Sequence, residues 1–311
     1  MNVKVCKFGG SSVKDASQIK KVFNIIKSDE KRKVIVVSAP GRDDTHNEKI
    51  TDHLLNLSTD GNHFCEQKIE VSAKDSFDAI INKFEQLCKD LKVDSKPIID
   101  SLVKDLNNNS LKGEKRNAFF LSRGEHYNAK LITEFMRKNG LNIKLMLPED
   151  FGFILTSEYC DGKVSKKTHK NISEYFNFEK ADYYLVPGFY GINEDKEISV
   201  MSRGGSDLTG GELAYALDAD IYENWTDTNG VYEVDPRVIK GANVIPRLTF
   251  KELRLLSSKG FNVFHFNAML NCKKSKIPIN IRNTNNPEHE GTLILNERVP
   301  MEDLVGIAKL D

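Results

Sequence analysis

The feature that most constrains the fold is a short, wholly apolar and β-branched run, Val34 to Val37. Such a run favours a strand that is buried on both faces, as the strands of parallel sheets are. Residues 3–8 predict an earlier strand, and apolar residues recur at helical spacing between positions 19 and 26. Further strand candidates are residues 183–186, 198–201 and 277–281. Strands that alternate with helices predict an α/β fold with a parallel sheet covered on both sides.

Composition excludes several classes of protein. The chain has 311 residues, of which 39% are hydrophobic, and this length predicts one domain of two lobes or two domains. Lys plus Arg and Asp plus Glu each number 45, so a nucleic-acid surface is not expected as the main function. The charged N-terminus does not read as a signal peptide, and no apolar run is long enough to cross a membrane. The chain has five cysteines and no Cys-x-x-Cys pair, so we expect neither a zinc site nor a disulfide framework. This cysteine usage predicts a cytoplasmic setting.

The first candidate for chemistry is a glycine-rich turn, Lys7-Phe8-Gly9-Gly10-Ser11-Ser12, between a predicted strand and a predicted helix. Glycines let a backbone approach an anion closely, and N–H groups at a helix start point toward it. A common structural turn explains the pattern equally well. The chain has no Walker A loop and no G-x-G-x-x-G fingerprint, which disfavours a dinucleotide enzyme.

A second glycine pair occurs in Ser202-Arg203-Gly204-Gly205-Ser206-Asp207, again after a strand and before an apolar helix. Asp207 is interpretable as a helix N-cap, and Arg203 as half of a surface ion pair. Two Gly-Gly-Ser turns, each with charged neighbours, favour instead a cleft that handles a phosphate and a carboxylate.

The third segment runs from Trp225 to Arg237 and contains the turn signals Asn-Gly and Asp-Pro. It predicts either a polar loop or a nucleotide pocket in which Tyr232 stacks on a base, Asp227 accepts hydrogen bonds and Arg237 binds phosphate. Glu125 is a further candidate, either as a carboxylate at a helix start or as the partner of a substrate ammonium.

Two stretches are interpreted as structural. The charged segment from about 60 to 115 is helical in pattern and predicts a solvated helical insertion. Thr249 to Glu252 matches a capping box at the start of a helix that Lys259-Gly260 would close.

The three segments, in this order and spacing, resemble aspartate kinases of the amino acid kinase family over residues 1–296. The resemblance implies a three-layer αβα sandwich with a mostly parallel central sheet over residues 1–300. Its aspartate-binding lobe would span about 1–190 and its nucleotide-binding lobe about 191–300. Residues 301–311 would begin an ACT regulatory domain that is missing from the chain. The implied reaction is ATP-dependent phosphorylation of the β-carboxylate of L-aspartate, the first step toward lysine, threonine and methionine.

Site roles follow from the resemblance, residue by residue. Lys7 and Asp207 would be catalytic, with Lys7 on the transferring phosphoryl group. The implied nucleotide-binding residues are Lys7, Gly9, Gly10, Ser11, Ser12, Thr226, Asp227, Tyr232, Arg237 and Asn262. The implied aspartate-binding residues are Ser38, Thr51, Glu125, Phe189, Arg203, Gly204, Gly205 and Ser206. ATP and Mg²⁺ would be bound together, with no metal site of the protein's own. Dimers are usual in the resembled family, so a homodimer is the suggested assembly.

The chain departs from the family pattern at two positions. Asn262 stands where the family commonly has Lys, and Phe266 stands where it has Pro. Loss of one phosphate cation can lower a rate by roughly 10² to 10³. A catalytically weakened, ligand-binding homologue therefore stays open as an alternative. A sister kinase that acts on glutamate, acetylglutamate or carbamate is a separate alternative, although the two glycine motifs favour aspartate over these substrates.

Overall fold

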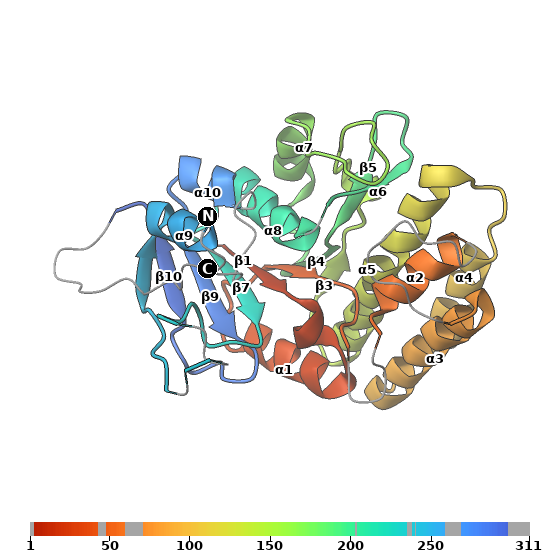
Figure 1. The fold of residues 1–311 in the computed structure, drawn as a ribbon, viewed down its shortest axis with the longest axis horizontal. Coiled ribbons are helices and arrows are strands. Elements are labelled where there is room, and N and C mark those ends of the chain that lie inside the picture. Colours follow the sequence, from red (N-terminus) through yellow and green to blue (C-terminus); the bar gives the residue numbers. More distant parts are fainter. Residues whose placement is uncertain are drawn as a thin grey trace.

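The central feature of the fold is an eight-stranded sheet. The structure is a computed structural model that describes residues 3–42, 48–59, 71–202, 204–234, 238–239, 241–258 and 269–297. In order across the sheet the strands are β3 (Ile143–Leu145), β4 (Tyr183–Pro187), β2 (Val34–Val37), β1 (Lys4–Phe8), β7 (Ile221–Thr226), β9 (Ile279–Asn283), β10 (Thr292–Leu295) and β8 (Arg247–Thr249). Neighbouring strands are parallel except for β9 and β10. The predicted mostly parallel sheet is therefore confirmed (Figure 1).

Helices cover both faces of this sheet. On one side lie α1 (Ala16–Lys27) and α5 (Gly113–Lys138), and α2 (Ile50–Ser58), α3 (Ala73–Leu91) and α4 (Lys96–Leu106) pack on α5 and on one another, within the same hydrophobic cluster. The other face packs on α6 (Pro148–Phe151), α7 (Lys167–Tyr175), α8 (Gly205–Ala216), α9 (Phe250–Ser258) and α10 (Leu270–Lys274). Successive side chains of a strand point to opposite faces of the sheet. Cys6 of β1 therefore packs with the helices α1 to α5, and Val5 packs on the side of α6 to α10. The three-layer αβα sandwich is confirmed.

The remaining strands form a small separate hairpin. Residues 198–201 were expected to contain a strand, and β6 (Ile198–Val200) is one, but it pairs antiparallel with β5 (Tyr190–Ile192) outside the main sheet. The hairpin lies against α5, and Tyr190 and Val200 bury their side chains with Ala118 of that helix.

The predicted helical insertion is present in its described part. Helices α3 and α4 follow one another there and group with α2 at one end of the molecule (Figure 1). The capping box is present too: the Thr249 N–H donates to Glu252 Oε2 at 2.8 Å, and the Glu252 N–H donates to Thr249 Oγ1 at 3.2 Å. The expected close of α9 at 259–260 and the residues 301–311 assigned to a further domain lie outside the described residues.

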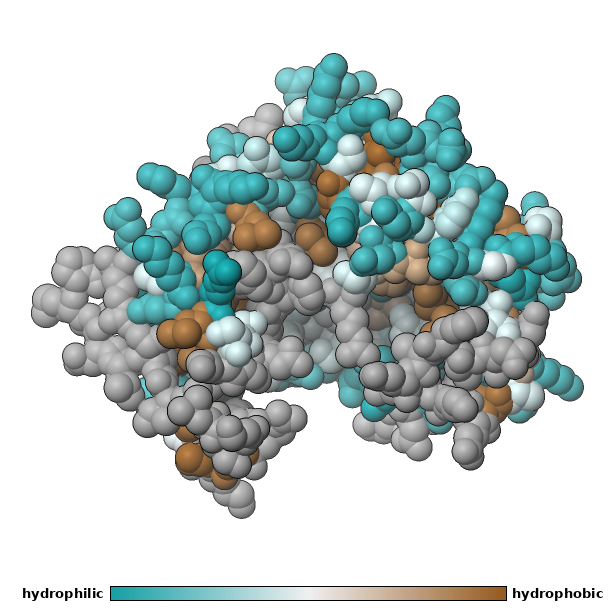
Figure 2. Space-filling model, turned by 45° about the horizontal axis from the view of Figure 1, so that its top comes forward, coloured by the Kyte–Doolittle hydropathy of each residue, from teal (hydrophilic) through white to brown (hydrophobic). Residues whose placement is uncertain are grey.

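Among the residues that Figure 2 colours by hydropathy, this face is mainly hydrophilic, with hydrophobic side chains in small separate groups. None of the helices in the described ranges has both the length and the apolar character needed to span a bilayer.

The topology singles out the end of β1. After β1 the chain adds β2, β4 and β3 on one side of it, and β7 and β9 on the other. In open α/β sheets, ligands bind beyond the carboxyl ends of the strands at such a reversal of strand order. The residues that follow β1 and those that end β7 are therefore placed at the expected binding edge.

Candidate active site

A cleft of about 630 Å³ opens at this edge of the sheet. It gathers residues that the sequence had assigned separately to catalysis and to aspartate binding. Those that line it are Lys7, Ser38, Thr51, Glu125, Phe189, Gly204, Gly205, Ser206 and Asp207. Apolar side chains, including Leu55, Leu121 and Val200, complete the wall. The structure thus brings together residues from β1, α2, α5 and α8.

Lys7 and Asp207 form an ion pair in this cleft. Lys7 Nζ lies 2.6 Å from Asp207 Oδ1, and both side chains are largely buried. Gly204 precedes α8 with a φ of 82°, a left-handed conformation that favours glycine, and it occupies the N-cap position. The interpretation of Asp207 as an N-cap is therefore wrong. Asp207 lies within the first turn of α8, and its carboxylate turns to Lys7.

A third side chain at this pair was missed by the sequence analysis. Asn224 of β7 is 4% exposed, and its Nδ2 donates to Asp207 Oδ1 at 2.8 Å. An amide inside an otherwise buried strand was the only signal available, and no local pattern links it to Asp207.

Glu125 lies in the middle of α5 and not at a helix start, which corrects one sequence interpretation. The helix passes very close to the loop after β2 at Gly124. A glycine fits there because a Cβ on Gly124 would lie 2.8 Å from the Ala39 Cβ. Glu125 consequently faces the end of β2, where the Ala39 amide donates to its carboxylate.

The carboxylate of Glu125 is buried and only partly satisfied. The side chain is 4% exposed, and Oε2 has no hydrogen-bond partner among the described residues. Burial raises the pKa of Glu125 to about 8, although the Ala39 amide and the charge of Lys7 act in the opposite direction. A buried acceptor without a partner, next to a cleft, fits a cationic ligand group.

The glycine turn after β1 is fastened to the nucleotide-side segment. The Gly9 N–H donates to the Trp225 carbonyl at 3.1 Å, and a 3₁₀ turn follows from Gly10 to Val13. Gly9, Gly10 and Ser11 remain half-exposed beside the cleft. Ser12 is buried, and its Oγ lies 2.7 Å from Thr284 Oγ1, so its hydroxyl holds the turn to the end of β9.

The residues predicted to hold a nucleotide are placed only in part. Thr226 ends β7, the next residue Asp227 is exposed, and Tyr232 is half-buried with a backbone bridge to Val244. Arg203, Arg237 and Asn262, and the second departure Phe266, lie outside the described residues.

Beneath this segment lies a buried charged cluster that sequence reasoning did not anticipate. Trp225 donates from Nε1 to Glu223 Oε2 at 2.9 Å, and Arg32 Nε lies 2.8 Å from the same oxygen. The guanidinium groups of Arg32 and Arg282 lie 5.1 and 4.7 Å from the Trp225 ring centre. These contacts fix the strand that leads into Thr226.

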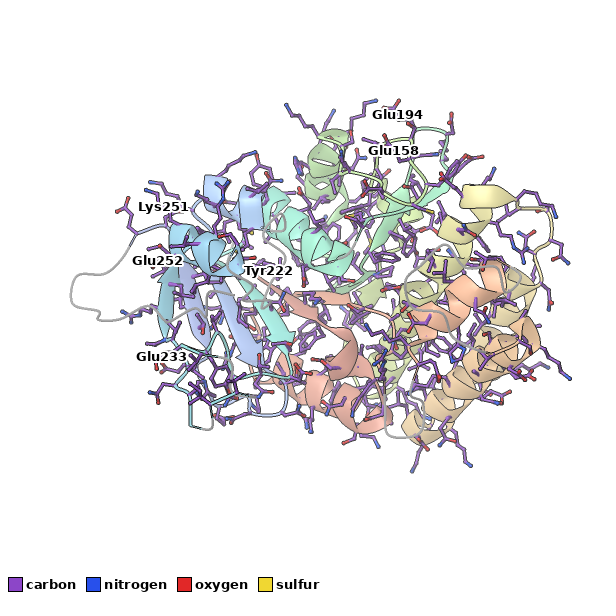
Figure 3. All side chains as sticks on the ribbon, in the orientation of Figure 1. Glu158, Glu194, Tyr222, Glu233, Lys251 and Glu252 are labelled. Atoms are coloured by element: carbon purple, nitrogen blue, oxygen red, sulfur yellow. The ribbon has the colours of Figure 1, made fainter. Side chains whose placement is uncertain are left out.

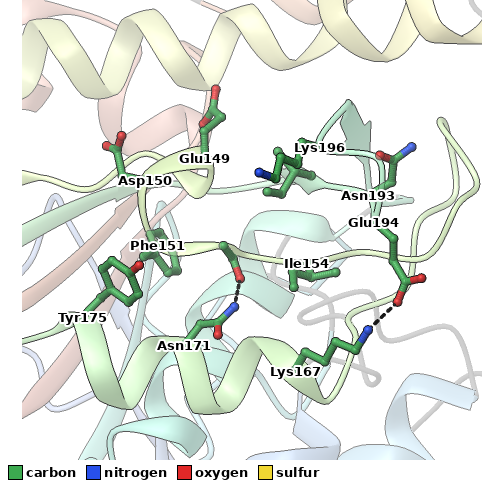
Figure 4. A pocket seen from close by; sticks show the side chains of 12 residues that line it. Glu149, Asp150, Phe151, Ile154, Lys167, Asn171, Tyr175, Asn193, Glu194 and Lys196 are labelled. Atoms are coloured by element: carbon green, nitrogen blue, oxygen red, sulfur yellow. Dashed lines mark hydrogen bonds and ion pairs between the residues drawn. The ribbon is translucent and has the colours of Figure 1, made fainter.

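A second hollow, of about 450 Å³, lies between α7 and the β5–β6 hairpin (Figure 4). Lys167 and Glu194 form an ion pair at 2.8 Å across its rim, and Asn171 donates to the Gly152 carbonyl. None of the predicted site residues lines it. The cleft at β1 is therefore the candidate active site.

Comparison with known proteins gives a consistent result. The model of the amino acid kinase family matches residues 2–283. Aspartokinase 3 of Bacillus subtilis is 36% identical over 302 residues, which cover 95% of this chain and 64% of that protein. The aspartokinase of Chlamydia muridarum is 32% identical over 305 residues, again 95% of this chain and 64% of the relative.

Solved structures resemble the fold closely. The crystal structure of Clostridium acetobutylicum aspartate kinase has a TM-score of 0.81 and 33% identity, and the match covers 98% of this chain and 66% of that one. E. coli aspartokinase III in complex with aspartate and ADP has a TM-score of 0.82 at 23% identity, over 96% of this chain and 65% of that one. The chain thus spans a little under two thirds of the length of these relatives.

Proposed function

The chain belongs to the amino acid kinase family, and on that premise we propose that it transfers the γ-phosphoryl group of ATP to the β-carboxylate of L-aspartate. The product is 4-phospho-L-aspartate, the first intermediate toward lysine, threonine and methionine. The similarity to aspartokinases over 95% of the chain supports this choice of substrate.

One observation carries the proposal: a buried carboxyl group and an ion pair line the same cleft. Glu125 presents a buried carboxylate oxygen that lacks a partner among the described residues, and the Lys7–Asp207 pair supplies a cation beside it. A zwitterionic amino acid matches this arrangement, because its ammonium pairs with Glu125 while its side-chain carboxylate faces Lys7. Arg203 lies outside the described residues, and we propose that its guanidinium binds the α-carboxylate through two parallel hydrogen bonds.

The reaction needs positioning more than proton transfer. A free β-carboxylate has a pKa of about 3.9 and is ionised at pH 7, so no general base is required. Its oxygen forms a bond to the γ-phosphorus while the bond to the ADP oxygen breaks. Lys7 neutralises charge on the transferring group, and backbone N–H groups of Gly9, Gly10 and Ser11 are nearby donors.

Mg²⁺ is proposed to arrive with the nucleotide. Among the described residues, no group of three or more His, Cys, Asp or Glu side chains is arranged to hold a metal ion. Nucleotide-bound Mg²⁺ needs only one or two protein carboxylates, since phosphate oxygens and waters complete its shell. Asp207 fits that requirement, and bound Mg²⁺ would add electrostatic stabilisation of the phosphates.

We assign the two substrates to the two lobes of the domain. Aspartate would bind to the lobe of residues 1–190, and ATP to the lobe of about 191–300 through Thr226, Asp227, Tyr232, Arg237 and Asn262. A homodimer, a cytoplasmic location and the absence of nucleic-acid or membrane partners remain predictions from the sequence.

ADP release from Mg-ATP tests the proposal, measured with and without L-aspartate and with L-glutamate and N-acetylglutamate as controls. Aspartate-dependent release is expected. Release with glutamate or acetylglutamate alone would assign a sister kinase. Binding of ATP and aspartate by calorimetry without turnover, with activity gained in Asn262→Lys, would assign a weakened ligand-binding homologue.

A further inference from the structure

We infer that Asn224 is a positioning residue for phosphoryl transfer, whose side-chain amide holds the Asp207 carboxylate in the orientation that pairs with Lys7. The inference deepens the proposed kinase function and rests on it. Nothing in the sequence motifs assigns this residue, which lies ahead of the Trp225 segment and inside β7.

The sheet itself places Asn224 beside the ion pair. Lys7 of β1 and Asn224 of β7 are partners in the parallel register. Side chains at these two positions point to the same face of the sheet, the face covered by α8. Asp207 lies in the first turn of α8, directly over both strands. The three side chains therefore meet because of strand register and helix packing, without any proximity in sequence.

Oδ1 of Asp207 accepts two hydrogen bonds at once. Lys7 Nζ lies 2.6 Å from it and Asn224 Nδ2 lies 2.8 Å from it. An ion pair with a single contact leaves a carboxylate free to rotate, whereas a second donor from a rigid strand fixes its plane. Asn224 is 4% exposed, so water cannot easily replace this donor.

The main chain of Asp207 is held from the same strand. Tyr222, two residues before Asn224, donates from its hydroxyl to the Asp207 carbonyl at 3.1 Å. Figure 3 shows Tyr222 near the middle of the molecule, between β7 and α8. Asn224 Nδ2 lies 3.5 Å from the same hydroxyl. One face of β7 thus fixes Asp207 by its backbone and by its carboxylate.

Two substitutions separate a hydrogen-bonding role from a space-filling role. Asn224→Leu keeps the size and removes the donor. Asn224→Asp keeps the shape and turns the donor into a second carboxylate that repels Asp207. A positioning role predicts that kcat falls about ten- to a hundredfold in Asn224→Leu, the range typical when a residue that orients a metal ligand is lost. It also predicts a larger fall in Asn224→Asp, while KM for aspartate changes little in either variant.

The matched control is Thr133→Val in α5. Thr133 is fully buried, and its hydroxyl donates to the Ala129 carbonyl at 2.8 Å, so the substitution also removes one buried hydrogen bond. It shows how far Tm and kcat move when a polar contact outside the cleft is lost. A fall in kcat for Asn224→Leu that only matches this control would overturn the inference.

A second readout does not depend on turnover. Acetylation of Lys7 by acetic anhydride, followed by mass spectrometry, reports how firmly its amine is held. Asn224→Leu should speed this labelling several-fold, with exposed lysines such as Lys20 unchanged. If wild-type protein lacks aspartate-dependent ADP release but labelling still responds, the kinase proposal fails and with it the role in phosphoryl transfer, while the hold of Asn224 on the Lys7–Asp207 pair stands. If wild-type protein is active and Asn224→Leu changes neither kcat nor labelling, the inference is wrong.

Discussion

Lys7 of β1 and Asp207 of α8 meet at 2.6 Å at the reversal point of the sheet, where the strand order changes direction. Lys7 lies in β1 just before one glycine turn, and Asp207 lies in the first turn of α8 just after the other. The pair places a cation and an anion within a cleft that also contains Glu125 Oε2, which has no hydrogen-bond partner in the described part of the chain. The proposed phosphoryl transfer would therefore take place in a site whose Lys7–Asp207 pair is ordered before any ligand binds.

Replacement of Lys7 by Ala should abolish most turnover. The cleft then lacks the cation that we assign to the transferring phosphoryl group, and loss of one such contact costs about 10² to 10³ in kcat. KM for aspartate should change much less, because Glu125 and Arg203 remain. The control is Lys20→Ala, at an exposed position of α1. A near-normal kcat in Lys7→Ala would remove Lys7 from the mechanism.

Aspartate binding should release a proton. Burial raises the pKa of Glu125 to about 8, so the carboxyl is largely protonated at pH 7 in the free protein. An ammonium that docks against it requires the ionised form. Between pH 6 and 8 the Kd for aspartate should therefore fall as pH rises, by up to about tenfold per pH unit. Calorimetry in buffers of different ionisation enthalpy should give ~1 proton released per aspartate at pH 7.

The raised pKa of Glu125 also makes the stability of the folded protein depend on pH. Between about pH 4.5 and 8 the unfolded Glu125 carboxyl has lost its proton and the folded one retains it. The folded, ligand-free protein should consequently lose stability as pH rises through this window. Glu125→Gln should flatten this dependence and remove the proton release. A Kd for aspartate that does not vary with pH between 6 and 8 would contradict both expectations.

A methyl group added at Gly124 should disturb the aspartate side of the cleft. Alanine is the better helix former by about 1 kcal/mol. Against this gain, its Cβ would lie 2.8 Å from the Ala39 Cβ, and overpacking costs about 1–3 kcal/mol. The loop after β2 would shift away from α5 and take the Ala39 amide from Glu125. Gly124→Ala should therefore raise KM for aspartate and lower Tm.

The compensating variant tests the cause. Ala39→Gly removes the facing methyl, so the double variant Ala39→Gly/Gly124→Ala should recover most of the KM and Tm of the wild-type protein. Ala39→Gly alone is the matched control. Effects that simply add in the double variant would show that the two positions do not interact.

The parts of the site that depend on local pattern were predictable from the sequence. The predicted strands at 3–8 and 34–37 are confirmed, and both glycine pairs lie between a strand and a helix as expected. Each of these features has a short-range signal in the sequence. Their convergence in one cleft followed from the resemblance and from the expected parallel sheet. The roles assigned to Arg203, Arg237 and Asn262 stay predictions, since these residues lie outside the described part of the chain.

The strand β7 shows why the rest was not predictable. Its sequence, Ile221 to Thr226, interrupts its apolar residues with Glu223 and Asn224, so no window of the sequence favours a buried strand. Both polar residues are buried, and their partners, Arg32 and Asp207, come from elsewhere in the chain. A buried polar strand is stable only when distant partners satisfy it, and those partners are invisible until the fold is known.

The Arg32–Glu223 pair should be a major contributor to the stability of this strand. Arg32 is 6% and Glu223 is 1% exposed, and Arg32 also donates to the Ile25 carbonyl at 2.6 Å. Arg32→Met would leave the Glu223 carboxylate buried, with the longer contacts to Lys4 Nζ at 3.5 Å and Arg282 Nη1 at 3.9 Å as its remaining ion pairs among the described residues. Removal of one partner of a buried pair costs about 3–5 kcal/mol, so urea denaturation should show a loss of about 3 kcal/mol in the free energy of unfolding.

The double variant Arg32→Met/Glu223→Gln distinguishes the loss of the ion-pair attraction from the cost of a buried carboxylate without its closest cation. The introduced glutamine keeps an acceptor for the Trp225 indole but carries no charge, so the double variant should be more stable than Arg32→Met alone. This result follows because most of the cost comes from a buried carboxylate that has lost its closest cation and not from the pair itself. An exposed substitution, Lys20→Met, should leave the unfolding free energy within about 0.5 kcal/mol of wild type. If Arg32→Met is as stable as this control, the buried cluster does not hold β7 in place.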